Sequence, residues 1–208
     1  MVKKRVYLSA VACIVILIAS IAGYSQFIQQ PKKSWLHLDD FVVYQQDFAW
    51  AGGNSTGYMF WNITSLNGDM ANIRLLGLGI EISNGSVDIA KTEVNYQVNI
   101  TTRQIINCLA QSAEIGKKFP LWIPQSVQVG DAVQTSYGES FISPSQTLGI
   151  MGQNRSCWLV AYAYRNGNMD RYYDTSTGIC LLIRTHIFSD GILVAINETA
   201  VQTNIKSI

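Results

Sequence analysis

The feature that most constrains the fold is a series of apolar, β-branched and aromatic stretches separated by Asn-Gly or Asp-Gly pairs. Such pairs supply positive φ in the tight turns between antiparallel strands. They occur at Asn67-Gly68, Asn84-Gly85, Asn166-Gly167 and Asp190-Gly191. The pattern predicts strands over residues 41–50, 58–65, 73–83, 86–101, 157–165, 169–173, 179–188 and 192–203, with a hairpin loop over residues 52–57.

Alternation within these stretches indicates a sheet with one core face and one solvent face. In residues 94–101 the apolar side chains of Val94, Tyr96, Val98 and Ile100 alternate with polar ones. In residues 192–199, Ile192, Val194 and Ile196 likewise share one face, opposite Asn197. The polar faces of the two stretches include Asn99 and Asn197. We therefore predict a mainly β (α+β) fold built on one curved antiparallel sheet.

Residues 103–118 break this alternation, because Ile105, Ile106, Leu109, Ala113 and Ile115 approximate a helical stripe that ends before Gly116. We predict one short helix here, packed on the sheet. Residues 117–129 contain Phe119, Trp122 and two prolines. They are expected to form an extended connector whose aromatic side chains cover the edge of the core.

The N-terminal segment decides the compartment. Residues 6–24 carry no charge and follow Lys3, Lys4 and Arg5, and as a helix they would span about 28 Å, close to the thickness of a bilayer core. Residues 1–30 therefore predict a signal anchor, or a signal peptide cleaved before Gly23 or Gln26. A pilin-type leader and a lipid-modified Cys13 are further alternatives. Residues 31–208 are then one extracytoplasmic domain, either held at the cell membrane by a single transmembrane helix or secreted.

Six Asn-x-Ser/Thr sequons agree with export, since about two are expected by chance from this composition. The predicted glycosylation sites are Asn54, Asn62, Asn84, Asn99, Asn154 and Asn197.

Three cysteines follow the N-terminal segment, and an oxidising compartment favours one disulfide with one free thiol. If residues 157–188 form a meander, one strand separates Cys157 from Cys180, which places them about 10 Å apart and too far for a bridge. We therefore expect Cys108 to pair with Cys157 or Cys180. Three buried free thiols and an intermolecular bond remain as alternatives.

The usual signatures of catalysis and metal binding are absent from the sequence. Only His37 and His186 offer a near-neutral base, and no local enzyme motif, P-loop or zinc spacing occurs. Asp170 and Asp174 do not follow the spacing of a calcium loop, and a side-chain turn at Asp174 leading to positive φ at Gly178 explains them better. A net charge of +1 gives no indication of nucleic-acid binding. No enzyme activity, cofactor or metal is predicted.

Several short motifs resemble membrane-tethered, extracytoplasmic β-domains of archaea, most of which have no assigned function. They are Trp122-Ile123-Pro124, Val129-Gly130-Asp131, Arg155-Ser156-Cys157-Trp158, Tyr172-Tyr173-Asp174 and Thr177-Gly178-Ile179. The predicted architecture is also similar to the half-barrel of bacterial lipoprotein carriers. That likeness implies an apolar cavity for an acyl chain.

Three functions follow as hypotheses. The first is a non-enzymatic, glycosylated cell-surface domain with a binding or structural role. The second is a carrier of lipid or another apolar ligand, which requires a cavity of roughly 300 Å³ or more between sheet and helix. The third is a surface-fibre subunit in which Phe41-Val42-Val43-Tyr44 completes the sheet of a neighbour.

Overall fold

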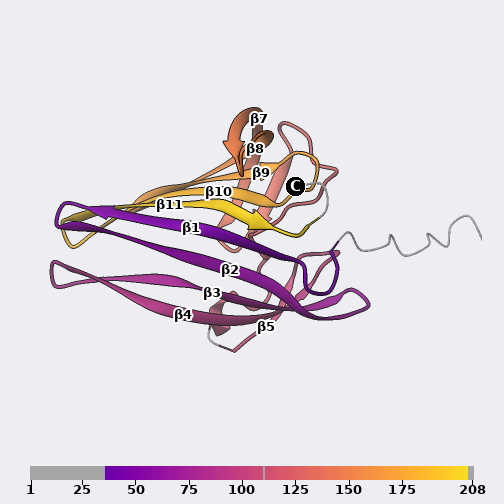
Figure 1. The fold of residues 1–208 in the computed structure, drawn as a ribbon, viewed down its shortest axis with the longest axis horizontal. Helices are drawn as coiled ribbons and strands as arrows, with labels where there is room; N and C mark the ends of the chain where they lie inside the picture. The colour runs from indigo at the N-terminus through magenta and orange to yellow at the C-terminus, as the bar shows by residue number, and fades with distance from the viewer. Residues whose placement is uncertain (1–35, 110, 206–208) are drawn as a thin grey trace, which may run out of the picture. The chain divides into compact units, whose positions relative to one another are not determined.

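The computed structural model describes residues 36–109 and 111–205, which form one antiparallel sheet of eleven strands (Figure 1). The predictions for residues 1–30, including the membrane helix and Cys13, lie outside the described residues. The strands are β1 (Phe41–Trp50), β2 (Gly53–Asn67), β3 (Met70–Ser83), β4 (Ser86–Asn99), β5 (Ile105–Cys108), β6 (Ala132–Thr135), β7 (Gly138–Ile150), β8 (Gln153–Tyr164), β9 (Gly167–Asp174), β10 (Cys180–Ser189) and β11 (Ile192–Thr203).

The strand order is β5-β4-β3-β2-β1-β11-β10-β9-β8-β7-β6. Strands that follow each other in sequence are neighbours in the sheet, except β5 and β6, which form its two edges. In addition, β1 pairs with β2 on one side and with β11 on the other. The first and last strands therefore meet in the middle of the sheet. Val42, Val43 and Tyr44 pair on both sides, and Phe41 pairs with Asn62 of β2, so in this structure residues 41–44 complete the chain's own sheet rather than that of a neighbour.

The predicted strands are confirmed, and β1 and β11 begin and end where the sequence indicates. The loop predicted over residues 52–57 is wrong, because β2 begins at Gly53 and pairs there with Trp50. The chain reverses at Ala51 and Gly52 alone. Strands β5, β6 and β7 were not predicted.

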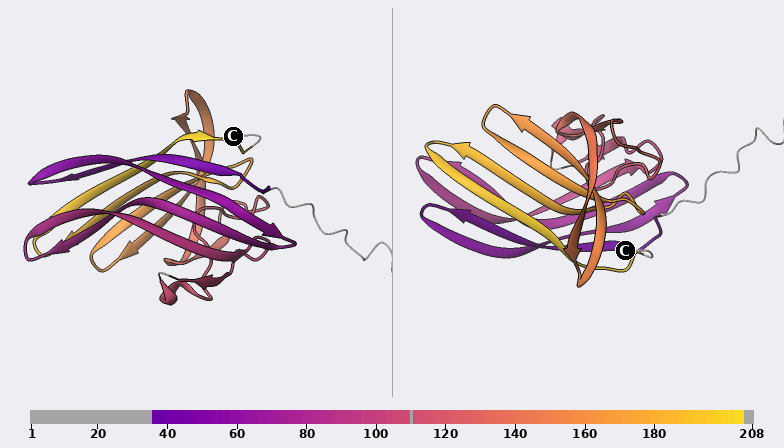
Figure 2. Two further views of the ribbon diagram at one scale, coloured as in Figure 1. Left: turned by 60° about the horizontal axis from the view of Figure 1, so that its bottom comes forward. Right: turned by 90° about the horizontal axis from the view of Figure 1, so that it is seen from above.

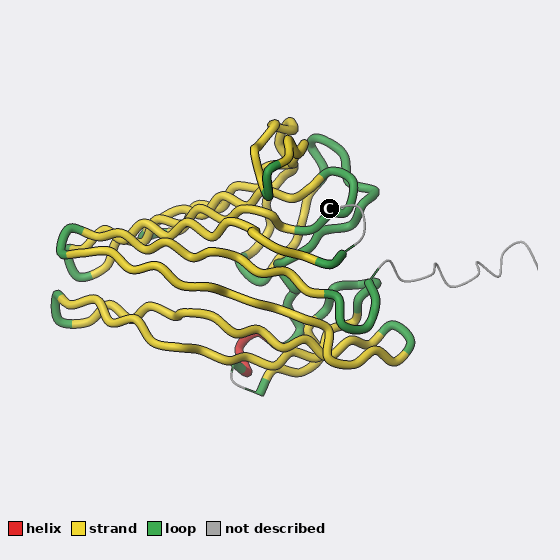
Figure 3. Tube along the Cα trace, viewed as in Figure 1, coloured by secondary structure: helices red, strands yellow, loops and turns green. Residues whose placement is uncertain are grey.

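The predicted helix over residues 103–118 is also wrong (Figure 3). Residues 105–108 form the edge strand β5 on β4, and the helical structure among the described residues is a single 3₁₀ turn, η1 (Ser112–Glu114), which buries no side chain. Ile105 is fully buried whereas Leu109 is 84% exposed, so the apparent helical stripe does not face the core. Backbone pairing with the free edge of β4 outweighs the weak helical pattern.

The sheet curls strongly, as Figure 2 shows from two directions. Tyr96 of β4 is close enough to Tyr137 and Arg171, on the far side of the curl, to interact with them electrostatically. Burial and the neighbouring Cys108 are the largest causes that raise the pKa of Tyr96. The concave face therefore encloses the core. The described part of the chain contains no helix that is both long and apolar enough to span a bilayer.

One end of the concave face is closed by the connector predicted from residues 117–129. Phe119 and Trp122 are each 1% exposed, and their rings lie 4.7 Å apart. Trp122 also packs on Trp61 of β2, at 6.1 Å between ring centroids. The connector pairs with the start of β10, since Ile123 N–H donates to Gly178 O at 2.9 Å.

Arg103 ties the two free edges of the curled sheet together. Its buried guanidinium donates to Trp122 O at 2.9 Å in the connector and to Gln134 O at 2.8 Å in β6. Burial lowers the pKa of Arg103. The half-barrel is thus held by side-chain hydrogen bonds at the place where no strand ladder closes it.

Candidate ligand-binding site on the concave face

A row of polar side chains crosses the concave face next to the closed end. The register aligns Arg171 of β9 with Ile183 of β10, Ile183 with Glu198 of β11, and Glu198 with Gln46 of β1. Arg171 and Glu198 therefore flank one intervening strand, about 10 Å apart at the backbone. We call Arg171, Glu198 and Gln46 the polar row.

Arg171 is the buried cation of this row, with 3% of its surface exposed. Its Nε donates to Met169 Sδ at 3.1 Å, its Nη1 donates to Pro120 O at 3.0 Å, and the ring of Tyr137 covers it at 4.7 Å. None of these partners is an anion. Among the described residues, Arg171 forms no ion pair and its Nη2 has no hydrogen-bond acceptor.

Gln46 is 2% exposed and connects the row to the sheet on its other side. Its Nε2 donates to Glu198 Oε1 at 2.7 Å, and its Oε1 accepts from Leu78 N–H at 2.8 Å. The partner of Gln46 in the β1–β2 ladder is Gly57. Because Gly57 has no side chain, the side chain of Gln46 can reach across β2 to the backbone of β3. Burial raises the pKa of Glu198, against the opposing effects of the Gln46 hydrogen bond and Arg171.

A cavity of about 480 Å³ opens beside the polar row. Its walls combine Arg171, Glu198 and Thr185 with five largely apolar side chains, which are Tyr137, Tyr164, Met169, Ile187 and Ile196. We call this space the Arg171 cavity. Its volume exceeds the roughly 300 Å³ expected for a carrier, although the predicted helix does not form one of its walls.

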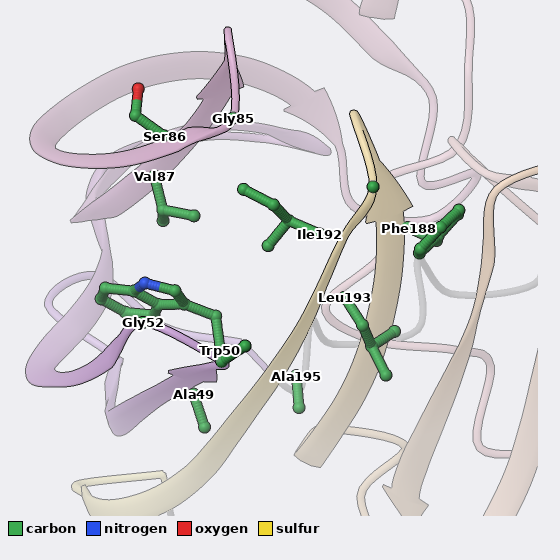
Figure 4. Close-up of a pocket in the computed structure, with 12 residues that line it drawn as sticks. Ala49, Trp50, Gly52, Gly85, Ser86, Val87, Phe188, Ile192, Leu193 and Ala195 are labelled. Atoms are coloured by element: carbon green, nitrogen blue, oxygen red, sulfur yellow. The ribbon is translucent and has the colours of Figure 1, made fainter.

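From the polar row to the hairpin tips, through the walls of this cavity, the concave face is mainly apolar. The next aligned set is Met169, Thr185 and Ile196, and the one after it is Ile187, Val194 and Trp50. At the tips, Trp50, Val87 and Ile192 come from three different hairpins and point toward one another (Figure 4). They line a second, wider cavity of about 730 Å³, which we call the tip cavity.

The side-chain turn predicted at Asp174 is confirmed. Its Oδ1 accepts from Ser176 N–H and Thr177 N–H, both at 2.9 Å, and Gly178 adopts φ of 75°. Asp174 is buried, and its other carboxylate oxygen lies 3.9 Å from Arg155 Nη1. Throughout the described ranges, no cluster of three or more His, Cys, Asp or Glu side chains is arranged to hold a metal ion.

The other predicted site residues lie apart from the cavity. His37 and His186 are exposed at separate places. Among the sequon asparagines, Asn54, Asn84 and Asn154 are exposed, and Asn62, Asn99 and Asn197 are half-buried. Glycosylation itself stays a prediction.

The predicted disulfide of Cys108 is not present, because Cys108, Cys157 and Cys180 are all buried free thiols in the structure. The meander that separates Cys157 from Cys180 is confirmed, with β9 between β8 and β10. Cys108 belongs to the edge strand β5, at the opposite end of the strand order from β8. The helix predicted over residues 103–118 left no basis for placing Cys108 on this edge strand.

The polar row was missed from the sequence, although a signal was present. Gln46, Arg171 and Glu198 each occupy a position where the alternation of their strand calls for an apolar residue. Glu198, for example, follows Ile192, Val194 and Ile196 on the same face of β11. A polar residue that interrupts an apolar face in each of three strands is the pattern that would have identified the site.

No family model and no curated protein matches this sequence. Solved structures with a partly similar strand arrangement include three bacterial proteins. One from Bacteroides fragilis is described as exported with a YmcC-like fold (6% identity, 81% of this chain and 97% of that chain covered, TM-score 0.40). One from Parabacteroides distasonis is described as a lipoprotein (8% identity, 82% and 98% covered, TM-score 0.40). The third is the hypothetical lipoprotein YmcC from Escherichia coli (12% identity, 79% and 89% covered, TM-score 0.33). The archaeal resemblance gains no support from them, and at TM-scores below 0.5 the likeness supports no conclusion on function.

Proposed function

We propose that this chain is a non-enzymatic binding protein that holds an apolar molecule on the concave face of its half-barrel. The observation that carries the proposal is the cavity of about 480 Å³ beside the polar row. Small-molecule sites are typically concave, mainly apolar, and furnished with a few polar groups. The Arg171 cavity has this composition.

The curled sheet explains how such a space persists in a folded domain. The closed end is filled by Tyr44, Trp61, Phe119 and Trp122, which are 0% to 1% exposed. Toward the hairpin tips, Ile187, Ile196 and Trp50 are only partly buried. An apolar ligand would remove these side chains from water, with a gain of about 25 cal/mol per Å² of apolar surface buried.

We also propose that the protein acts outside the cytoplasm, at the cell surface or secreted. This rests on the uncharged N-terminal stretch, the basic residues before it and the excess of sequons. Its partners are then a membrane, through the N-terminal segment, and the apolar ligand.

The proposal is tested by photo-crosslinking of the full chain, reconstituted in lipid nanodiscs, with dodecanol that carries a diazirine on its alkyl chain. Peptide mass spectrometry then locates the labelled residues. Specific labelling is expected on β9, β10 and β11 at Met169, Ile187 and Ile196, and an excess of unlabelled dodecanol should abolish it.

A cavity-filling variant and a matched control make this test specific. Ile196→Trp places a large side chain in the Arg171 cavity and is expected to remove most of the labelling. Val201→Trp makes the equivalent change on the same strand at a residue that is 42% exposed and outside the cavity, and should leave labelling unchanged. Labelling confined to residues outside the concave face would refute the proposed function.

A further inference from the structure

We propose that the ligand is an amphiphile with a single anionic head group, a carboxylate or a phosphate, which Arg171 binds while the apolar chain extends toward the hairpin tips. This inference rests on the proposed function and names the chemistry of its ligand. It depends on the buried charge of Arg171, which forms no ion pair among the described residues, on the order of polarity along the concave face, and on the environment of Glu198.

The first argument is the charge of Arg171. A guanidinium remains protonated in proteins, and burying it is costly unless an anion and hydrogen bonds compensate. Here the partners of the guanidinium are a thioether, a carbonyl and an aromatic ring. These leave the Nη2 side of a 97% buried fork without an acceptor among the described residues, next to a cavity that the same side chain lines. A carboxylate or phosphate oxygen is the partner that this geometry accepts best.

The second argument is the direction in which polarity falls along the face. The polar row lies deepest, against the closed aromatic end. The aligned set Met169, Thr185 and Ile196 follows, and then Ile187, Val194 and Trp50 near the tips. From Glu198 to Ile192 the distance along β11 is about 20 Å at 3.3 Å per residue. A molecule with a charged head and an extended alkyl chain matches this sequence of environments from end to end.

The third argument concerns Glu198, the one acidic side chain that lines the cavity. It faces Arg171 from β9, Gln46 and Tyr44 from β1, and Cys180 from β10. Its carboxylate is held by Gln46 at 2.7 Å and forms no ion pair with Arg171. An incoming anion could therefore bind the guanidinium of Arg171. The negative charge of Glu198 nearby would repel the same anion. We assign Glu198 as a positioning residue that limits the affinity for anions.

The experiment is a competition against the photoreactive dodecanol in the full chain in nanodiscs. The competitors are dodecanoate, dodecyl phosphate, dodecanol and dodecyltrimethylammonium, with inorganic phosphate as a probe without an alkyl chain. We expect dodecanoate or dodecyl phosphate to compete at a concentration at least about tenfold lower than dodecanol, which is the gain from one charge-assisted hydrogen bond. The cationic amphiphile should be the weakest, and inorganic phosphate alone should not compete.

Two substitutions change the charge in opposite directions. Arg171→Gln should remove the preference for the anionic competitors. Glu198→Gln keeps the size of the side chain, removes a negative charge and should strengthen competition by dodecanoate. The matched control is Asp170→Asn, which removes a carboxylate one residue from Arg171, on the opposite face of β9, and should have no effect. Because Glu198→Gln is isosteric and the competitor series uses the unmodified chain, the inference can be tested even if Arg171→Gln fails to fold.

The outcomes separate the two proposals. Equal competition by dodecanol and dodecanoate, with labelling still on the concave face, would overturn the anionic head group and leave the proposed function standing. The absence of specific labelling by any probe would overturn both. Full competition by inorganic phosphate would show a site for a free anion and would overturn the amphiphile. A stronger effect of Asp170→Asn than of Glu198→Gln would also contradict the assignment.

Discussion

The contact between the connector and the start of β10 can be tested with a glycine-to-alanine substitution, which adds one methyl group. Gly178 has φ of 75°, and a Cβ atom there would lie 2.3 Å from the backbone oxygen of Ile123. Gly191 has almost the same φ, 76°, but a Cβ atom there would meet nothing within 4 Å. The variants Gly178→Ala and Gly191→Ala therefore share the cost of a left-handed backbone, and the first adds a steric clash with the connector.

The magnitudes follow from the hydrogen bonds at this place. The left-handed conformation costs an alanine about 1–2 kcal/mol in either variant. In Gly178→Ala the connector must also move, which disturbs the bonds from Ile123 N–H to Gly178 O and from Cys180 N–H to Leu121 O, both 2.9 Å long. At about 1 kcal/mol for each bond, Gly178→Ala should be less stable than Gly191→Ala by about 2 kcal/mol.

Thermal unfolding followed by tryptophan fluorescence measures this difference, because Trp61 and Trp122 are both buried where the connector packs. For a chain of this size, about 2 kcal/mol corresponds to a Tm roughly 4–8 °C lower for Gly178→Ala than for Gly191→Ala. Equal Tm values for the two variants would show that the connector is not held against β10, and would refute the described closure of the concave face.

Two further predictions concern titratable groups. The folded-state pKa of Glu198 is raised mainly by burial, so its contribution to stability is full below about pH 4.3 and is lost as the pH rises through the folded-state value; urea unfolding between pH 4 and pH 8 should therefore show a smaller loss of stability in Glu198→Gln than in the wild type. Burial raises the pKa of Cys157 and of Cys180 to about 12, so iodoacetamide at pH 8 should label neither thiol before unfolding, and urea should expose Cys108, Cys157 and Cys180 to labelling, whereas a disulfide would leave two of them unlabelled.

The fold was predictable from the sequence where two independent signals coincide. Strands β1 and β11 are rich in apolar, aromatic and β-branched residues and are bounded by clear turn residues, and their predicted limits match the structure. Strand β7 has neither, because its middle is polar and contains Pro144, which has no N–H to donate. The register of β7 with β8 is irregular there, between Ser143 and Gln146. Such a strand next to the sheet edge depends on the neighbours with which it pairs and leaves little trace in its own sequence.

The candidate site was less predictable for a related reason. Gln46 lies more than a hundred residues before Arg171 and Glu198 in the chain, and it joins them only because β1 pairs with β11. Alternation identifies each as a polar residue on an apolar face. It does not reveal that the three faces form one surface. Local turns such as the one at Asp174 were predictable, since all of their hydrogen bonds lie within a few residues.

The pairing of Val42 with Thr203 has a consequence for the order in which the molecule can be made. In a nascent polypeptide β1 emerges before the other strands of this sheet, and one edge of β1 has no neighbour until β11 has been synthesised. The half of the sheet that is synthesised first, β1 to β5, therefore exposes the unpaired edge of β1 for most of translation. Such an edge promotes aggregation, and pairing of strands far apart in sequence slows folding. Loss of β11 would leave the two halves of the domain without the strand that joins them.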